Sequence, residues 1–375
     1  MAGPGSRTGA IAMKRWLPAW AGAPRLDPVL LVLLLLIMGF GLIVLYSASG
    51  QNMALVNRQA VRLGVGLLAL LVISQVPPRV LRAWTPWLYG LGIAMLLATL
   101  VLGVGRGTQR WLDLGLFRFQ PSELMKLAVP MMVAWYLHSR ILPPDWKNTG
   151  VTLGILLVPT LLIYRQPDLG TSLLVAASGV FTLYLAGLRW RVLFGFAGLA
   201  AAAAPVLWLV MKEYQRDRVR TFLNPEADPL GHGWNIIQSK IAVGSGGLTG
   251  KGWLNGTQSN LEFIPERHTD FILAVLSEEF GLVGVLLLML AYVLLIARGL
   301  YIANLARDTG SRLLAGALSL TLFVYVLVNG GMVSGILPVV GVPLPLISYG
   351  GTSAVTLLAG FGMMMSIYGH RKFIR

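Results

Sequence analysis

The sequence predicts an all-α polytopic membrane protein with about ten transmembrane helices and a long structured extracytoplasmic loop between helices seven and eight. Hydrophobic residues fill 56% of the 375 positions, charged residues only 12%, and the mean hydropathy is +0.72. Several apolar runs reach the roughly 20 residues that a helix needs to cross a bilayer. No run shows the alternating, turn-punctuated pattern of a membrane β-barrel.

Apolar runs give the positions of the helices. The predicted spans are residues 28–47, 58–76, 84–104, 121–138, 149–164, 170–187, 190–211, 270–297, 311–335 and 350–369. The first span is too long for a cleaved signal peptide and lacks a small-residue cleavage pattern. We expect a disordered cytoplasmic lead at 1–27, a single transmembrane domain at 28–370 with a long outer loop at about 212–269, and a cytoplasmic tail at 371–375.

Basic residues set the expected orientation. With ten helices, one side of the membrane receives Lys14, Arg15, Arg25, Arg79, Arg82, Arg140, Lys147, Arg189, Arg191, Arg298, Arg307, Arg312, Arg371, Lys372 and Arg375. Cytoplasmic loops are enriched in Lys and Arg, so both termini are predicted to be cytoplasmic. The net charge of +15 then needs no nucleic-acid partner, because it follows from this bias and from attraction to anionic membrane lipid. The absence of cysteine excludes disulfides, thiolate metal sites and a cysteine nucleophile.

Two outer loops depart from this pattern. The loop after the third span carries Arg106, Arg110 and Arg118 on the translocated side. The segment 212–269 is long but not of low complexity, and long loops are usually functional or disordered. We expect it to form short interfacial helices and tight turns that lie on the membrane and line a cavity.

Two motifs within that segment invite ligand assignments that fail on spacing. Gly250-Lys251 resembles part of a P-loop, but Ser245 stands where the first glycine should be and Gly252 where Ser or Thr should be. Flexible turns are the favoured interpretation, and a backbone nest for phosphate is the alternative. Glu266, His268 and Asp270 lack the two-histidine helical spacing of a zinc enzyme, so the metal site is unknown.

Several polar residues lie inside predicted spans. Glu123 and Lys126 are three residues apart on one helix face and can pair. The pair is either a structural clamp or a binding site for charged substrate in an aqueous cavity. Asp168 has the same ambiguity, because an acidic residue at a helix start also caps free N–H groups. At least one of Glu278 and Glu279 must face protein or water, since lipid-facing carboxylates are disfavoured.

Two further segments indicate a site. Residues 335–351 contain no charge and three prolines, so they cannot be helical throughout. Irregular backbone at membrane depth needs protein or a water-filled cavity around it, so this segment is predicted to cap a cavity. The run Phe263–Ile272 places Glu266, Arg267, His268 and Asp270 directly before an apolar helix, where charged groups by default mark function.

These motifs resemble those of the SEDS family (shape, elongation, division and sporulation), and are most similar to its elongation branch, the RodA group. The matching segments are Arg110-Trp, Gln120-Pro-Ser-Glu, Gln166-Pro-Asp-Leu-Gly-Thr, Asn224-Pro-Glu-Ala-Asp-Pro-Leu-Gly, Gln238-Ser-Lys-Ile-Ala, Gly244-Ser-Gly-Gly, Gly256-Thr-Gln, Pro265-Glu-Arg-His-Thr-Asp-Phe and the run from Leu337 to Gly351. The resemblance covers residues 28–370 in order.

The resemblance implies a glycosyltransferase that polymerises lipid II at the outer face of the bacterial cytoplasmic (inner) membrane. It also implies a class B penicillin-binding protein as partner and a divalent cation, Mg²⁺ or Mn²⁺, as cofactor. The family's essential aspartate matches Asp270, and its acid and lysine match Glu123 and Lys126. We therefore expect these three residues to be catalytic. The expected substrate-binding residues are Arg58, Arg110, Gln120, Asp168, Arg220, Lys251, Glu266 and Arg267.

The chemistry of that reaction fits these residue types. An α-linked donor that becomes a β-linked product calls for one inverting displacement, which needs a general base, and Asp270 is the candidate. The leaving diphosphate needs positive charge, which Lys126, Arg110, Arg58 or Arg220 can supply. His268 is interpreted as an ordinary hydrogen-bonded histidine.

Two other functions also fit a polytopic protein with a polar interior. One is a lipid II flippase or transporter, although the two halves show no evident inverted repeat. The other is a non-catalytic scaffold for a transpeptidase.

Overall fold

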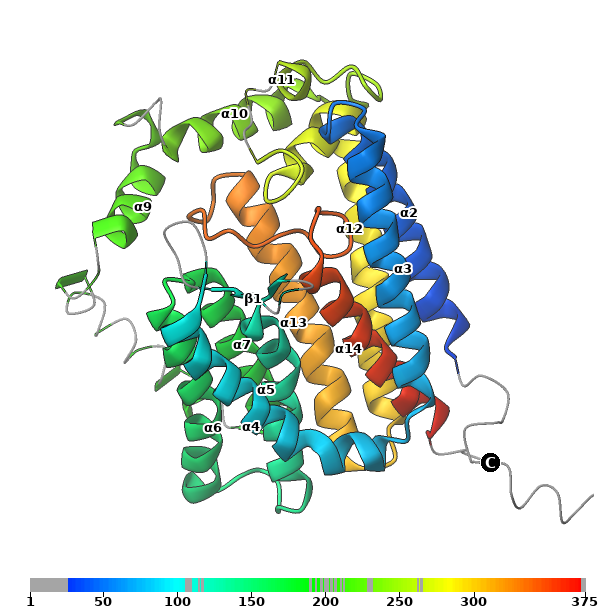
Figure 1. Cartoon of the computed structure of the whole chain (residues 1–375), viewed down its shortest axis with the longest axis vertical. Helices are drawn as coiled ribbons and strands as arrows, with labels where there is room; N and C mark the ends of the chain where they lie inside the picture. Colours follow the sequence, from blue (N-terminus) through cyan, green and yellow to red (C-terminus); the bar gives the residue numbers. More distant parts are fainter. Residues whose placement is uncertain are drawn as a thin grey trace, which may run out of the picture.

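A computed structural model describes residues 26–104, 110–113, 115, 118–188, 191–192, 194–195, 198, 202, 205, 208–209, 211, 213–227, 232–261, 263 and 266–371. Long helices lie side by side in a bundle, and shorter helices lie across one end of it (Figure 1). The predicted span 190–211 falls mostly outside the described residues. So do nearly all of the predicted lead and tail.

Nine of the predicted spans are helices within the described residues. They are α2 (Pro28–Ala48), α3 (Met53–Gln75), α4 (Pro78–Leu102), α5 (Pro121–His138), α6 (Trp146–Arg165), α7 (Leu169–Leu185), α12 (Ile272–Leu305), α13 (Thr309–Val333) and α14 (Thr352–Gly369). Seven of these, all except α5 and α7, are long and apolar enough to cross a membrane. The all-α prediction holds apart from a two-stranded antiparallel hairpin, β1 (Leu112–Asp113) and β2 (Arg118–Phe119).

Side-chain caps explain why several helices start before the apolar run that predicted them. Asp27, Asn52, Asp145, Asp168 and Asp308 each precede a helix and accept a hydrogen bond from a backbone N–H of its first turn. Such caps satisfy N–H groups that have no partner inside the helix. Hydropathy registers only the apolar face, so it places the starts of α3, α6 and α13 a few residues late.

One predicted span is broken in the structure. Within α12, Gly281 has φ 63° and ψ −164°, which no helical residue adopts, so residues 272–280 and 282–305 form two helical segments. The amides of Leu282 and Val283 donate to the carbonyls of Gly247 and Leu248, both at 3.0 Å. The prediction of one continuous helix was therefore wrong, because the break depends on contacts with a distant turn.

That turn, residues 246–252, is called the glycine clip here. Its Lys251 and Gly252 amides donate to the carbonyls of Glu278 and Glu279, both at 3.0 Å, and so cap the first segment of α12. A Cβ at Gly246 would lie 2.0 Å from the Ser277 carbonyl oxygen, and one at Gly250 2.1 Å from that of Glu279. The glycines are thus required by close backbone approach.

The clip also decides between the two interpretations of Gly250-Lys251. The Gly250 amide donates to the Gly246 carbonyl at 2.8 Å, and the next two amides bind α12 as described. These three N–H groups are therefore unavailable to a phosphate. The alternative of a phosphate-binding nest was wrong, and the turn interpretation holds.

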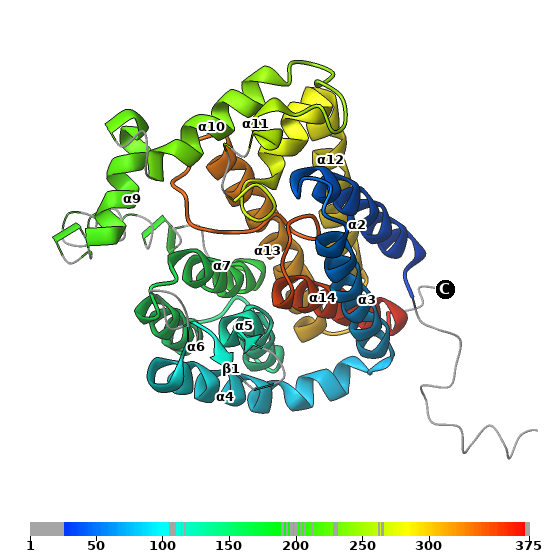
Figure 2. The same cartoon turned by 45° about the horizontal axis from the view of Figure 1, so that its top comes forward.

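The segment before α12 forms the predicted short helices and turns. It contains α9 (Glu213–Leu223), the 3₁₀ helix η1 (Pro225–Ala227), α10 (His232–Ser245) and α11 (Thr257–Asn260). In both views these helices lie at one end of the bundle (Figures 1 and 2). We call residues 213–261 the outer segment. It is tied to the bundle where the Ser239 hydroxyl donates to the Val333 carbonyl of α13 at 2.9 Å.

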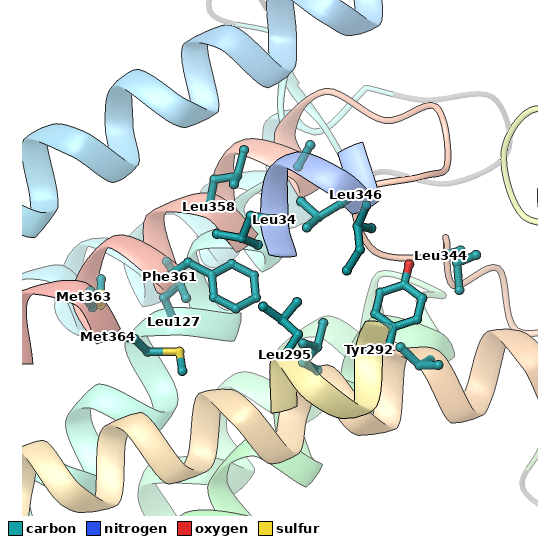
Figure 3. Close-up of a cluster of buried hydrophobic side chains, with 14 of the residues drawn as sticks. Leu34, Leu127, Tyr292, Leu295, Leu344, Leu346, Leu358, Phe361, Met363 and Met364 are labelled. Carbon is teal, nitrogen blue, oxygen red and sulfur yellow. The ribbon is translucent and has the colours of Figure 1, made fainter. Parts of the chain in front are cut away.

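Residues 335–351 contain no helix, as predicted, and are called the capping loop. Buried polar side chains of the bundle satisfy its backbone: Asn329 donates to the Val342 carbonyl at 2.8 Å, and Tyr292 to the Pro345 carbonyl at 2.6 Å. Gln59 brackets the far end, donating to the Ser348 carbonyl and accepting from the Gly350 amide, both at 3.2 Å. Leu344 and Leu346 of the loop join the core beside Tyr292 and Leu34 (Figure 3). This pairing is what irregular backbone inside a bilayer requires.

Candidate active site

A buried ion pair lies in the first turns of α5. Pro121 opens the helix, and Glu123 and Lys126 share one face, with Nζ of the lysine 2.7 Å from Oε1 of the glutamate. Both side chains are buried, at 6% and 7% exposure. Lys126 also lies 5.2 Å from the ring centre of Tyr325 in α13, and Oε2 of Glu123 has no hydrogen-bond partner among the described residues. The predicted pairing is confirmed, and one carboxylate oxygen is left over.

A second polar group lies beside this pair. Asp168 caps α7 by accepting from the Thr171 amide at 3.2 Å, and its other oxygen accepts from Gln120 at 3.1 Å. Arg110 lies 3.9 Å from the same oxygen and donates to the carbonyls of Gln166 and Pro167. Asp168 is therefore a helix cap and also part of a polar cluster, so the two interpretations of this residue are compatible.

These two groups line one wall of a cavity of about 200 Å³. The opposite wall is formed by the middle and the C-terminal end of the capping loop and by the start of α14. The lining residues are Arg110, Trp111, Gln120, Glu123, Lys126, Asp168, Thr171, Leu174, Gly341, Val342, Pro343, Gly350, Gly351, Thr352 and Ser353. The cavity combines two carboxylates with a lysine and an arginine, which suits an anionic ligand that also carries hydrogen-bonding groups.

Asp270 lies next to the cavity, in contact with the capping loop. Its Oδ2 lies 3.5 Å from the position of a Cβ at Gly341, a residue of the cavity wall with φ +74°. The Asn329 amide donates to the Asp270 carbonyl at 2.9 Å and to the Val342 carbonyl, so it fixes the aspartate backbone against the loop. The structure therefore brings three elements together: the start of α5, the capping loop and the turn before α12.

The neighbours of Asp270 have local roles. Glu266 accepts from the Thr269 hydroxyl at 2.6 Å, and the Phe271 amide donates to the Glu266 carbonyl at 3.2 Å. His268 packs edge-on against Tyr349, and its carbonyl accepts from the Tyr349 amide at 2.9 Å. Arg267 is partly buried beside Gly50. These contacts shape the turn that holds Asp270.

Five predicted substrate-binding residues do not line the cavity: Glu266 and Arg267, described above, and three further basic residues. Arg58 is exposed on α3 and donates to the Ala54 carbonyl. Arg220 is exposed on α9, where Glu213 and Asp217 hold it at 2.7 and 3.2 Å, and the hydrogen bond to Glu213 contributes most to raising its pKa. Lys251 lies in the glycine clip, 2.7 Å from Glu278.

Sequence reasoning missed Arg62. Its guanidinium lies 4.6 Å from the ring centre of Tyr349, and its Nε is 3.2 Å from the Cβ position of Gly351 on the cavity wall. Arg62 follows Arg58 by one helical turn, so both lie on one face of α3. A second arginine in an apolar helix was the signal that pointed to this place.

The fold and this cavity define an α-helical integral membrane protein with a charged site built from three distant parts of the chain. Residues 28–373 match the profile of the cell cycle protein family of FtsW, RodA and SpoVE. The chain belongs to this family.

Named relatives agree with the family. The chain is 56% identical to the peptidoglycan glycosyltransferase MrdB of Escherichia coli K12, over 93% of this chain and 95% of the relative. It is 35% identical to the stage V sporulation protein E of Bacillus subtilis, over 92% and 98%.

Solved structures share the fold. A chain from a peptidoglycan synthase complex, described as coordinating polymerization and crosslinking, superposes with a TM-score of 0.80 at 35% identity, covering 92% of this chain and 97% of that one. The rod shape determining protein RodA of Thermus thermophilus gives 0.71 at 31% identity, over 95% and 99%.

Proposed function

We propose that this protein is a peptidoglycan glycosyltransferase that joins lipid II units into glycan strands during cell elongation. Its family, and its 56% identity to a relative named for this activity, support the assignment. The observation that carries the mechanism is the position of Asp270, whose carboxylate lies against the wall of a cavity that also holds Glu123 and Lys126.

Asp270 acts as the general base in this mechanism. A free aspartate has a pKa of about 3.9, too low to remove a proton from an alcohol before attack. The carboxylate instead accepts the proton of the acceptor hydroxyl as the new glycosidic bond forms. A positioned base of this kind contributes roughly 10²–10⁴-fold in rate. The donor sugar inverts, and the diphosphate leaves from its other side.

The wall that carries Lys126 and Arg110 serves the diphosphate. Lys126 and Arg110 both line the cavity and stabilise the negative charge that develops on the leaving group. Arginine offers paired N–H donors to phosphate oxygens, and lysine acts as a point charge. Arg62 adds a further positive charge beside Gly351, at the capping-loop wall. Asp168 holds Arg110 and Gln120 in place.

A divalent cation fits this wall when it arrives with substrate. The described residues contain no group of three His, Cys, Asp or Glu side chains that could hold a metal by themselves. Mg²⁺ commonly uses only one or two carboxylates together with substrate phosphates and water. The unpartnered Oε2 of Glu123 supplies such a ligand, with Asp168 on the same wall. When bound, the cation would neutralise diphosphate charge.

The volume of the cavity limits how much substrate it can hold at one time. Small-molecule sites usually measure roughly 300–1,000 Å³. At about 200 Å³, this cavity accepts a diphosphate or one sugar, but not donor and acceptor together. Part of the two substrates therefore lies outside this cavity, with the lipid tail leaving sideways between helices.

The proposal extends to place and partner. The protein lies in the inner membrane with both termini in the cytoplasm and the cavity opening to the outer face, as the distribution of basic residues predicts. A class B penicillin-binding protein is its partner, and the similarity to a chain of a synthase complex that couples polymerization to crosslinking supports this.

One assay tests the function. Purified protein, alone and with its transpeptidase, is given labelled lipid II and Mn²⁺, and glycan polymer is measured. Wild type is expected to form polymer. The polymerisation rate of Asp270→Asn should be at least about 100-fold lower. Asp113→Asn, an exposed carboxylate of the hairpin, is the matched control and should keep full activity.

The outcomes separate the alternatives. Absence of polymer from wild type even with the partner would exclude the polymerase and leave the scaffold. Lipid II crossing a vesicle membrane without polymer would support the flippase. Normal polymerisation by Asp270→Asn would remove only the assignment of the base.

A further inference from the structure

The end of the bundle opposite the outer segment contains a basic cavity of about 600 Å³. It lies where α4 begins, α5 ends, α13 begins and α14 ends (Figure 1). Its charged and titratable lining residues are Arg79, Arg82, His138, Arg307, Asp308 and His370. Three arginines therefore face one carboxylate, and the cavity carries net positive charge.

The single carboxylate is already engaged. Asp308 lies 3.0 Å from Arg82, and it accepts from the Ser311 amide and hydroxyl at 3.0 and 2.9 Å. Neither Arg79 nor Arg307 has an ion-pair partner among the described residues. Two arginines at the cavity are thus left for an anion that the described residues do not provide.

A second hollow shows which kind of anion fits. A mostly apolar groove of about 30 Å³ between α4, α5 and α13 shares Pro78, Arg82, Ser311 and Ile367 with the basic cavity, so the two hollows adjoin. The groove is lined further in by Leu81, Met131 and Leu314. Its side is edged by Trp135, which is 38% exposed, and tryptophan is typical of the membrane interface.

We propose that these adjoining hollows bind one anionic phospholipid. Arg79 and Arg307 hold the phosphate, which suits the paired donors of a guanidinium. The groove receives the first methylenes of an acyl chain, which continues into the bilayer along α4, α5 and α13. A soluble phosphate would use only the basic half, whereas a phospholipid matches both halves and their order along the membrane normal.

The site differs from the general attraction of basic residues to membranes. Arg140 and Lys147 are exposed at the same end of the bundle but do not line the cavity. Each basic residue near an anionic surface adds to lipid attraction in the same way. Removing two charges from the cavity or two from outside it therefore changes net charge equally, while only the first change removes the site.

The experiment measures retained lipid on the full-length protein by native mass spectrometry, titrating phosphatidylglycerol against a phosphatidylcholine background. Wild type is expected to retain one phosphatidylglycerol. Arg79→Gln/Arg307→Gln should bind it at least about tenfold more weakly. Arg140→Gln/Lys147→Gln should match wild type. Because Arg79 and Arg307 are exposed and unpaired, both double variants should keep the wild-type melting temperature; Arg79→Lys/Arg307→Lys should recover part of the binding.

Three results would overturn the proposal. Equal weakening in both double variants would mean diffuse attraction. Equal retention of phosphatidylcholine would mean that the arginines select nothing. Competition by glycerol phosphate at the concentrations at which phosphatidylglycerol binds would mean a site for a soluble anion, with no part for the acyl chain.

Discussion

Two buried glutamates in this molecule each hold a lysine at the same distance, yet their surroundings differ. Glu123 meets Lys126 at 2.7 Å within α5, and Glu278 meets Lys251 at 2.7 Å between α12 and the glycine clip. Oε1 of Glu278 also accepts from the Thr257 hydroxyl and the Gln258 amide, at 2.9 and 3.1 Å. Glu123 has only its lysine, and its Oε2 is unpartnered among the described residues.

The difference separates a structural acid from one that is available to a ligand. Buried polar atoms are nearly always hydrogen-bonded, so an unpartnered one calls for an explanation. Glu278 holds the glycine clip and the start of α11 against α12, and this structural role explains its contacts. Glu123 lines the cavity beside Asp168, and a substrate or cation there would complete its contacts.

The strongest test of this comparison is Glu123→Gln. The amide leaves Lys126 without its counter-charge and removes the free carboxylate oxygen from the cavity. Polymerisation per folded protein is expected to fall on the order of 10²-fold. The melting temperature should also fall, because the buried Lys126 keeps its charge without a partner, which costs about 3 kcal/mol. A structural clamp would show the same loss of stability, but with normal activity in the folded protein that remains.

The counterpart is Lys251→Met. Glu278 has a side chain of 0% exposure and would keep its charge without a cation. Breaking a buried pair from one side costs about 3 kcal/mol of stability. The double variant Lys251→Met/Glu278→Gln should recover most of that loss, and Lys147→Met, at an exposed lysine, should cost almost nothing. Equal stability of the single and double variants would mean that the pair holds nothing together.

The clip itself is tested by Gly250→Ala. A methyl group there would lie 2.1 Å from the Glu279 carbonyl oxygen, at a backbone φ of +80°. Overpacking of this kind costs roughly 2 kcal/mol. Gly244→Ala is the matched control, because its methyl group would meet nothing within 4 Å. The melting temperature of Gly250→Ala should be lower than that of Gly244→Ala. Identical melting temperatures would show that the clip backbone shifts to make room for the methyl group.

A third carboxylate environment, at Asp308, should give the smallest effect. Burial would raise the pKa of Asp308, but hydrogen bonds from Ser311 and the charge of Arg82 outweigh it and hold the pKa below its ordinary value. The resulting stability is present above the ordinary aspartate pKa and is lost as pH falls through the lowered one.

Asp308→Ala, which removes a helix cap, should therefore cost about 1 kcal/mol at neutral pH. Melting temperatures measured from pH 7 to pH 3 should converge for wild type and variant. A constant difference across that range would show that ionisation of Asp308 adds nothing.

The sequence predicted those features that depend on local spacing. The positions of nine helices, the Glu123–Lys126 pair and the irregular capping loop follow from hydropathy, an i,i+3 interval and three prolines. Asp270 was singled out by charge beside an apolar helix, which is also a local signal.

Features that depend on distant contacts could not be predicted. Gly281 lies in an apolar run that reads as one helix, and its break is created by backbone approach of the glycine clip some thirty residues earlier. Arg58, Arg220 and Lys251 were assigned to the substrate because they are basic and on the expected side. Arg58 and Arg220 instead bind Ala54 and Glu213 within their own helices. Only the partner of Lys251, Glu278 on α12, depends on a distant contact.

The break at Gly281 also sets the angle of the short helical segment that precedes it, and thereby the position of Asp270. Residues 272–280 form a rod roughly 14 Å long at 1.5 Å per residue, with the clip at one end and Asp270 just beyond the other. A change of about 4° in the angle between the two segments of α12 would displace the Asp270 carboxylate by about 1 Å. A misplacement of that size can cost on the order of 100-fold in rate. The way the outer segment packs on the bundle therefore sets the position of the Asp270 carboxylate in the site.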